Sequence, residues 1–183
     1  MQTTIIYAHP YDKSFNHAIL EKLLAKYATE DLAVIDLYKD GFKPVYTREE
    51  LALFKTGETL NSLVRHYQVQ LAKTDKLIIV SPIWWNNIPA IFKGFFDKVL
   101  KMNFAYCPTK TGVKGLLTNI TSDEVVTTST STTFYLRYFA GNCINSSVKS
   151  TLKQIGIQHF SWKHLGGISQ STAKKREKFL ATL

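Results

Sequence analysis

The chain has 183 residues, of which 45% are hydrophobic and 20% charged, a composition that excludes a disordered protein and predicts one domain over residues 1–183. Its formal net charge of +9 points to an anionic partner, for which nucleic acid and nucleotide phosphates are alternatives to a merely basic, solvated surface. The one tight basic run, residues 174–176, lies in a helical pattern without any nucleic-acid-binding motif, so we expect no nucleic-acid partner.

Short β-rich runs alternate with longer segments of helical period along the first half of the chain. Residues 4–8 predict a buried strand, residues 14–27 an amphipathic helix and residues 32–37 a second strand. Residues 48–73 hold helical segments. Residues 76–80 form the most hydrophobic strand, which we expect to be central and covered on both faces.

The second half continues the alternation with three helices and two strands. They are expected at residues 89–102 (a helix with a proline in its first turn), 124–127 (strand), 134–154 (helix), 157–164 (strand) and from about 171 (helix). Gly156 should end the long helix. Such alternation requires parallel strands joined by right-handed helical crossovers, so the fold class is α/β, a doubly wound sandwich of five strands.

In such a sheet a ligand binds at the carboxyl ends of the strands, so the chemistry is expected in the loops after the first, third and fourth strands. The first loop has neither a GxGxxG nor a Walker pattern, which argues against a dinucleotide fold of that type and against a P-loop NTPase. Ser14 stands where a helix N-cap belongs, beside free N–H groups that suit a phosphate, with His9 and Asn16 as further donors. The alternative is a plain capping serine.

The loop after the third strand carries two adjacent tryptophans, Trp84 and Trp85, between Pro82 and Pro89. Neighbouring side chains of an extended segment point to opposite sides, so both indoles cannot face the core. At least one is left where a flat aromatic ligand could lie against it. The alternative is that both fill a gap between the sheet and a helix.

Seven small hydroxyl residues, 127–133, follow the fourth strand. They offer many hydrogen-bond partners and little bulk, as the polar edge of a heterocycle requires, although such a run is more often an ordinary loop. Three loops of this kind at one end of a sheet favour a ligand site more than any one of them does.

Cysteine and histidine usage predicts no metal site. Cys107 and Cys143 are too few and too far apart for a disulfide framework or a CxxC site, which favours a reduced, cytoplasmic compartment. His159 and His164 have no carboxylate or cysteine beside them, which speaks against metal ligation. The longest apolar stretch, residues 77–85, is about half of a membrane span, so no membrane insertion is expected.

Several motifs stand at spacings shared with one known family. They are His9-Pro10, Ser14-Phe15-Asn16, Pro82-Ile83-Trp84-Trp85-Asn86, Pro89-Ala90, Lys93-Gly94, Phe96-Asp97-Lys98-Val99, Phe104-Ala105-Tyr106 and Thr127-Thr128. With them the chain resembles the flavodoxin-like NAD(P)H:quinone reductases, which include diaphorase-type reductases, modulators of drug activity and potassium-efflux ancillary reductases. The resemblance implies a flavodoxin-like three-layer sandwich with a five-stranded parallel sheet of order 2-1-3-4-5, a non-covalent flavin, and a homodimer with its sites at the subunit interface.

The resemblance also implies a function and a set of site residues. The chain would transfer two electrons from NAD(P)H to quinones or similar electron-poor aromatics by a ping-pong hydride transfer, with FMN as the flavin and FAD as the alternative. The implied cofactor-binding residues are His9, Ser14, Phe15, Asn16, Pro82, Ile83, Trp84, Trp85, Asn86, Thr127, Thr128, Ser129 and Thr130. Phe104 and Tyr106 would bind the substrate, in the pocket of their own or of the partner subunit, and Tyr135 would be the catalytic residue.

The chain departs from the family pattern at two places. The family's paired glycines are replaced by Ser129 and Thr130, so the approach of backbone to the flavin edge differs. A histidine that some members carry falls at Gly141, so Tyr135 or a water would act without it. Two alternative functions stay open: a regulatory flavoprotein subunit of a potassium-efflux-type transporter, and a flavodoxin-type electron carrier, which the positive charge disfavours.

Overall fold

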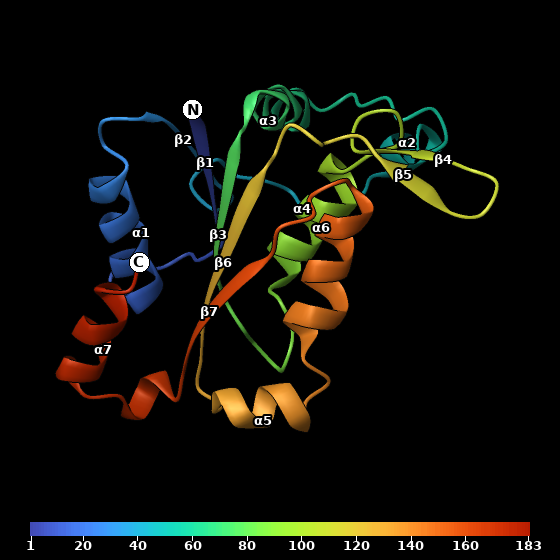
Figure 1. Cartoon of the computed structure of the whole chain (residues 1–183). Coiled ribbons are helices and arrows are strands. Elements are labelled where there is room, and N and C mark those ends of the chain that lie inside the picture. Colours follow the sequence, from blue (N-terminus) through green and yellow to red (C-terminus); the bar gives the residue numbers. More distant parts are fainter.

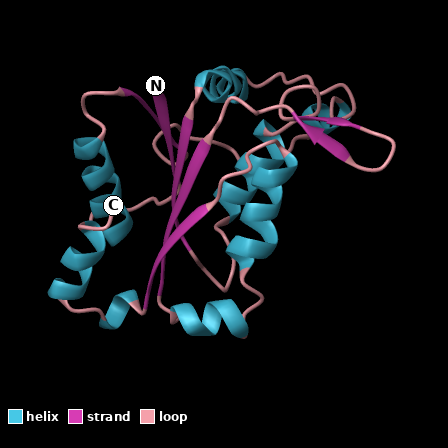
Figure 2. Ribbon diagram, in the orientation of Figure 1, coloured by secondary structure: helices cyan, strands magenta, loops and turns pink.

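The computed structural model describes residues 1–183, and a parallel five-stranded sheet lies at its centre (Figures 1 and 2). The strands of this sheet are β1 (Gln2–Tyr7), β2 (Asp31–Asp36), β3 (Lys76–Pro82), β6 (Ser122–Ser129) and β7 (Ser161–Gly166). Their spatial order is β2-β1-β3-β6-β7, and every neighbouring pair is parallel. This confirms the expected flavodoxin-like sandwich with strand order 2-1-3-4-5.

Helices cover both faces of the sheet (Figure 1). One face carries α1 (Phe15–Lys26) and α7 (Ala173–Leu180), and the other carries α3 (Ser62–Lys73), α4 (Ala90–Val99) and α6 (Ser150–Gln154). The remaining elements are α2 (Arg48–Ala52), the antiparallel hairpin of β4 (Tyr106–Pro108) and β5 (Val113–Gly115), α5 (Thr133–Tyr138), a π-helical segment η1 (Ile144–Lys149) and a 3-10 turn η2 (Ile168–Gln170).

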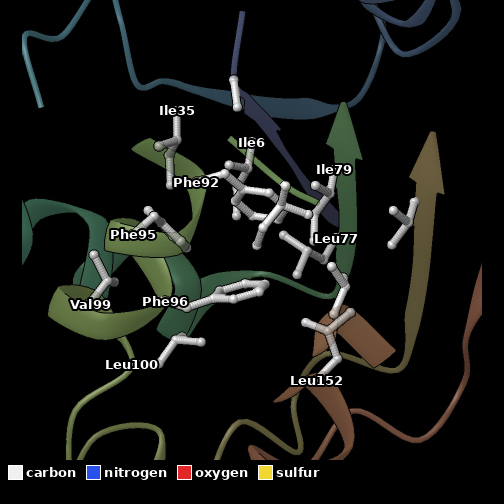
Figure 3. Close-up of a cluster of buried hydrophobic side chains, with 14 of the residues drawn as sticks. Ile6, Ile35, Leu77, Ile79, Phe92, Phe95, Phe96, Val99, Leu100 and Leu152 are labelled. Carbon is white, nitrogen blue, oxygen red and sulfur yellow. The ribbon is translucent and has the colours of Figure 1, made fainter. Parts of the chain in front are cut away.

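Two hydrophobic clusters hold the layers to the sheet. The larger has 29 buried residues and lies under α3, α4 and α6, where Phe92 of α4 packs in the same cluster as Ile79 of β3 (Figure 3). The smaller has 10 buried residues, among them Ile19 and Leu23 of α1. Residues 77–80 of β3 are all aliphatic and buried, as expected for a central parallel strand that is covered on both faces.

Two residues of α4 that belong to the family-like motifs, Gly94 and Lys98, have structural roles. Lys98 is 2% exposed and forms an ion pair with Glu50 of α2, Nζ to Oε2 at 3.0 Å. Burial alone would raise the pKa of Glu50, but the hydrogen bonds from the Thr47 N–H and from Lys98 outweigh burial and lower that pKa. A Cβ added at Gly94 would lie 2.3 Å from the Cβ of Pro44, so only glycine allows this loop to approach α4.

The single helix predicted over residues 134–154 is wrong. Helix α5 ends at Tyr138, and the chain becomes helical again only at η1, which leads into α6. Gly141 (φ +72°) and Asn142 (φ +44°) adopt left-handed backbone conformations that end a helix. As a result α5 lies across the carboxyl ends of the strands, at the bottom of Figure 1, instead of alongside the sheet.

Two other expectations need smaller corrections, and one element was not expected. The last strand begins at Ser161 and not at Ile157, because Gly156 (φ +111°) turns the chain and Ile157 is buried in the larger cluster within a loop. Pro89 is the N-cap of α4 and does not lie in its first turn. The hairpin of β4 and β5 was not predicted from the sequence.

Candidate functional site

A cavity of about 820 Å³ opens at the carboxyl ends of β1, β3 and β6, within the size range of small-molecule and cofactor sites. The three loops singled out from the sequence meet there. All but one of the predicted cofactor-contacting residues line it, namely His9, Ser14, Phe15, Asn16, Pro82, Ile83, Trp84, Trp85, Asn86, Thr128, Ser129 and Thr130, and Tyr135 lines it as well.

The N-terminus of α1 supplies an anion-binding wall. Ser14 is the N-cap, and its hydroxyl accepts the N–H of His17 at 3.1 Å. The N–H groups of Phe15 and Asn16 precede the first intrahelical hydrogen bond and have no partner in the helix, so they are available to a ligand together with the positive end of the helix dipole. Ser14 therefore caps the helix and lines the cavity at once.

Asn16 carries an unpaired buried group at this wall. Its side chain is 4% exposed, and its Nδ2 donates to Oγ1 of Thr128 at 2.9 Å. Its Oδ1 is buried without any partner. An unsatisfied buried amide oxygen is costly, on the order of 1–3 kcal/mol, which indicates that a ligand completes the site.

His9 presents a neutral ring with a defined tautomer. Its Nδ1 accepts the N–H of Tyr11 at 3.2 Å, so in the neutral ring the proton lies on Nε2. Burial lowers the pKa of His9 from its ordinary value and keeps the ring neutral at pH 7. The ring also packs edge-on against Trp84 at a centroid distance of 5.8 Å. His9 can therefore donate from Nε2 without carrying charge.

The loop after β3 is a tight two-residue turn with strained backbone. The N–H of Trp84 donates to Asn87 O at 2.8 Å and the N–H of Asn87 to Trp84 O at 2.9 Å, while Trp85 (φ +49°) and Asn86 (φ +62°) are left-handed. The side chain of Trp85 is 99% exposed, so the alternative in which both indoles fill a gap in the core is wrong. A strained, fully exposed indole at a cavity rim is the kind of outlier that marks a ligand site.

Three predicted site residues lie outside the cavity. Thr127 is fully buried and its hydroxyl is bonded to Trp162 and His164 of β7. Phe104 packs against the larger hydrophobic cluster. Tyr106 lines a separate depression of about 310 Å³ beside α4 and α6. Within one protomer, then, Phe104 and Tyr106 do not reach the main cavity.

Helix α5 forms an aromatic rim. Tyr135 is 44% exposed, and its ring is stacked on Phe139 at a centroid distance of 6.4 Å. Its hydroxyl makes no hydrogen bond within the chain and is available to a ligand. Gly141 lies beyond the end of α5 and does not line the cavity.

Some residues of the site were not predicted from the sequence. Ser131, Leu136 and Ile168 also line the cavity. Ser131 belongs to the hydroxyl run and was recognisable there. Ile168 lies just after the end of β7, and no local sequence pattern indicates that it lines the cavity. His164 lies directly behind the cavity wall, where its two ring nitrogens contact Thr127 and Ser129.

No group of three or more His, Cys, Asp or Glu side chains is arranged to hold a metal ion. Neither is any helix both long enough and apolar enough to cross a lipid bilayer.

Comparison with known proteins gives a match over the full length of the chain. A family model described as a flavodoxin-like fold matches residues 1–183. An uncharacterized NAD(P)H oxidoreductase of Haemophilus influenzae is 27% identical over 98% of this chain and 91% of its own length. An FMN-dependent NADH:quinone oxidoreductase of Clostridium beijerinckii is 30% identical, but the match spans only 61% of this chain and 60% of the relative.

A solved structure agrees with the sequence relatives. The NAD(P)H:quinone oxidoreductase from Methanothermobacter marburgensis superposes with a TM-score of 0.87 at 25% identity, over 100% of this chain and 94% of that one.

Proposed function

Because the chain belongs to the flavodoxin-like family, whose model spans residues 1–183, we propose that it is an FMN-dependent oxidoreductase that passes two electrons from NAD(P)H to quinones or similar electron-poor aromatics. The relatives named as NAD(P)H oxidoreductase and as FMN-dependent NADH:quinone oxidoreductase support this reaction and this cofactor. The observation that carries the proposal is that a helix N-terminus suited to phosphate and a rim of exposed indoles share one cavity.

The residues present fit FMN. The free N–H groups at the start of α1, the Ser14 hydroxyl and the Nε2–H of His9 are the donors that a phosphate needs. The orphaned Oδ1 of buried Asn16 is an acceptor for a hydroxyl group of the ligand. Trp84, Trp85 and Tyr135 supply flat apolar surface for a ring system. FAD is the alternative. Its additional adenylate group would have to lie outside these contacts.

FMN when bound supplies the reversible uptake and release of a hydride. The residues of this chain bind the phosphate, orient the ring system and shape the space above it. The small hydroxyl side chains of the loop after β6 would leave room for the edge of the ring system, and the backbone N–H groups of this loop would be the donors that stabilise negative charge there.

We place the two half-reactions in the same cavity, in turn. A cavity of about 820 Å³ that holds FMN would leave space for one further flat molecule at a time. NAD(P)H therefore has to leave before the electron acceptor enters, which is a ping-pong sequence. Initial rates measured against both substrates should give parallel reciprocal lines, whereas converging lines would exclude this order.

Tyr135 is proposed as the catalytic residue, because its unpaired hydroxyl lies at the cavity rim. Tyr135→Phe removes only this hydroxyl and should lower kcat by about tenfold, the equivalent of one hydrogen bond made in the transition state. Stopped-flow traces of each half-reaction would show which step is slowed. An unchanged kcat in both would remove Tyr135 from the mechanism.

We also propose that the protein is a homodimer that completes the cavity. Aromatic side chains of the turn after β3 and of α5 are strongly exposed, with Trp85 at 99%, Phe134 at 64% and Tyr138 at 71%. Phe104 and Tyr106 do not reach the cavity of their own protomer, so a substrate-binding role for them requires the cavity of a second copy. Sedimentation equilibrium should give twice the mass of the chain, and Tyr106→Ala should raise the KM for the quinone. A monomer with full activity would rule this out.

The first experiment is an absorbance spectrum of the purified protein, followed by NADPH and then a quinone in the same cuvette. A yellow protein that bleaches and then regains colour is expected, and chromatography of the released flavin separates FMN from FAD. A flavin-free protein that takes up neither flavin would exclude the proposed function.

Ser14→Ala tests whether the N-terminus of α1 binds the phosphate of FMN. Loss of the N-cap should cost about 1 kcal/mol of stability, and FMN occupancy should fall as well. Thr47→Ala is the matched control, since it removes the N-cap of α2 far from the cavity and should cost stability without loss of FMN.

A further inference from the structure

An unbroken line of hydrogen bonds runs from β7 to the loop that walls the cavity. The indole Nε1–H of Trp162 donates to Oγ1 of Thr127 at 2.8 Å, and Thr127 Oγ1 lies 2.7 Å from Nδ1 of His164. His164 Nε2 lies 3.1 Å from Oγ of Ser129, whose hydroxyl donates to the backbone oxygen of Ser131 at 2.6 Å. We call these five residues the His164 chain.

The two ends of the His164 chain fix the direction of every bond in it. An indole N–H can only donate and a carbonyl oxygen can only accept. The Ser129 hydroxyl proton is committed to Ser131 O, so Ser129 Oγ can only accept from His164 Nε2–H. His164 Nδ1 is then free of a proton and accepts the hydroxyl of Thr127. Only the neutral Nε2–H tautomer of His164 leaves every member satisfied.

The segment held by the His164 chain is the cavity wall itself. Ser129 and Ser131 line the cavity, and so does Thr130 between them. The same Ser131 oxygen accepts the N–H of Gly167 at 3.0 Å, just beyond the end of β7. Close backbone contact reinforces the link, because a Cβ added at Gly166 would lie 2.8 Å from that oxygen.

We propose that His164 is a positioning residue of the FMN site: as a neutral imidazole it holds the Ser129 hydroxyl and thereby sets the Ser129–Ser131 wall of the cavity. The proposal rests on the function proposed above. It also accounts for a departure from the family pattern, since Ser129 stands where paired glycines begin and its side chain is used to pin the loop. His164 contacts no ligand itself and acts through Ser129.

The charges around His164 support a neutral ring. Burial, together with the nearby positive charge of Arg137 on α5, lowers the pKa of His164 to about 4, although a hydrogen bond with Thr127 acts in the opposite direction. Glu124 of β6 and Lys163 of β7 pair with each other on the opposite face of the sheet. Asp123 shares the face of Thr127 but lies four residues earlier on β6.

The tautomer can be tested directly by NMR on 15N-histidine-labelled protein, with or without FMN. The His164 signals should report a proton on Nε2 and none on Nδ1, with no titration from pH 8 to pH 5.5. A proton on Nδ1, or a midpoint above pH 6, would overturn the proposal. This measurement does not depend on flavin binding, so it stands even if the proposed function fails.

Two substitutions separate the two ends of the His164 chain. His164→Gln places an amide donor near the position of Nε2 and keeps the bond to Ser129, whereas His164→Asn is shorter and reaches only Thr127. Both should lower the melting temperature, because both disturb a buried network. His164→Asn should weaken FMN binding by about tenfold, the worth of one hydrogen bond, while His164→Gln should stay within about threefold of the parent.

Ser129→Ala covers the case in which the His164 variants fail to fold. It should weaken FMN binding about as much as His164→Asn, and the double variant should bind no more weakly than either single one, because both remove the same bond. Parent-like FMN affinity in His164→Asn or in Ser129→Ala would overturn the proposal while leaving the proposed function in place. Equal loss in His164→Gln and His164→Asn would reduce His164 to a structural role and also overturn it.

Discussion

The loops after β3 and β6, which both line the cavity, are held in place in different ways. The loop after β3 is fixed by its own residues, through two backbone hydrogen bonds between Trp84 and Asn87 and a proline at either end. The loop after β6 is fixed by groups that come from β7, about 35 positions later in the chain, above all His164 and Gly167.

This difference separates a wall that is set locally from a wall that depends on the rest of the fold. Unfolding of β7 would release the loop after β6, whereas the turn at Trp84 would keep its internal bonds. Changes at β7 should therefore affect the cavity strongly, and changes within the first loop should affect it only through the side chain that is removed.

The largest effect should come from acid. The pKa of His164 is about 4 in the folded protein against an ordinary value of 6.5, so its contribution to stability is complete above pH 6.5 and is lost as the pH falls towards 4. That loss amounts to at most about 3 kcal/mol. Urea unfolding at pH 7, 5.5 and 4 measures it.

The matched variant isolates this contribution from the other titrating groups. Burial raises the pKa of Asp123 to about 7, and both of its carboxylate oxygens lack a partner. Protonation of Asp123 therefore stabilises the folded protein as the pH falls, which opposes the effect of His164. Subtracting the curve of His164→Gln from that of the parent removes the effect of Asp123. A difference that does not change between pH 7 and pH 4 would contradict the expectation.

Gly166→Ala should displace the loop after β6, which is held by contacts with β7. The added Cβ would lie 2.5 Å from the N of Thr133, a backbone atom that cannot move aside alone. Overpacking of this kind costs about 2 kcal/mol, and FMN binding should weaken because the loop after β6 has to shift. Thermal melts and FMN titration would show both effects.

Gly167→Ala is the control for this substitution. Gly167 has φ +68° but nothing within 4 Å of an added Cβ, so alanine brings only backbone strain of about 1 kcal/mol. FMN affinity should be kept. If both glycine variants lose FMN to the same extent, the contact with the loop is not the cause.

The smallest change in stability is expected from a substitution in the turn after β3. Trp85→Gly removes an indole that is 99% exposed and relieves its left-handed backbone, so stability should change by less than about 1 kcal/mol. FMN occupancy and kcat/KM for a quinone should nevertheless fall. Trp85→Phe keeps a flat ring and should retain most of both; full FMN occupancy in Trp85→Gly would count against the assignment of this loop.

The same contrast explains which parts of the site could be predicted. Ser14, Trp84 and Trp85 owe their positions to a helix start and a short turn, and these have local sequence signals. The hydrogen bonds of Thr127 could not be predicted, because its partners Trp162 and His164 become neighbours only through the pairing of β6 with β7. The parallel five-stranded sheet followed from the alternation and its strand order from the family resemblance, whereas hydrogen bonds between side chains of different strands have no such signal.

Helix boundaries show the same limit. The apolar pattern over residues 134–154 fits one long helix, and Gly141 by itself did not break it. The break depends on two successive left-handed residues, Gly141 and Asn142, and asparagine at such a position gives only a weak signal.

That break has a consequence for how proteins of this design can change. Helix α5 has six residues and buries only Leu136, so most of its positions tolerate replacement without disturbing the core. Under the proposed function, substitutions there would alter the rim of the cavity that faces the electron acceptor, while the groups around α1 that would hold the cofactor stay intact. Acceptor preference can therefore diversify through a segment of two turns, and a small combinatorial library confined to α5 is a direct route to new specificities.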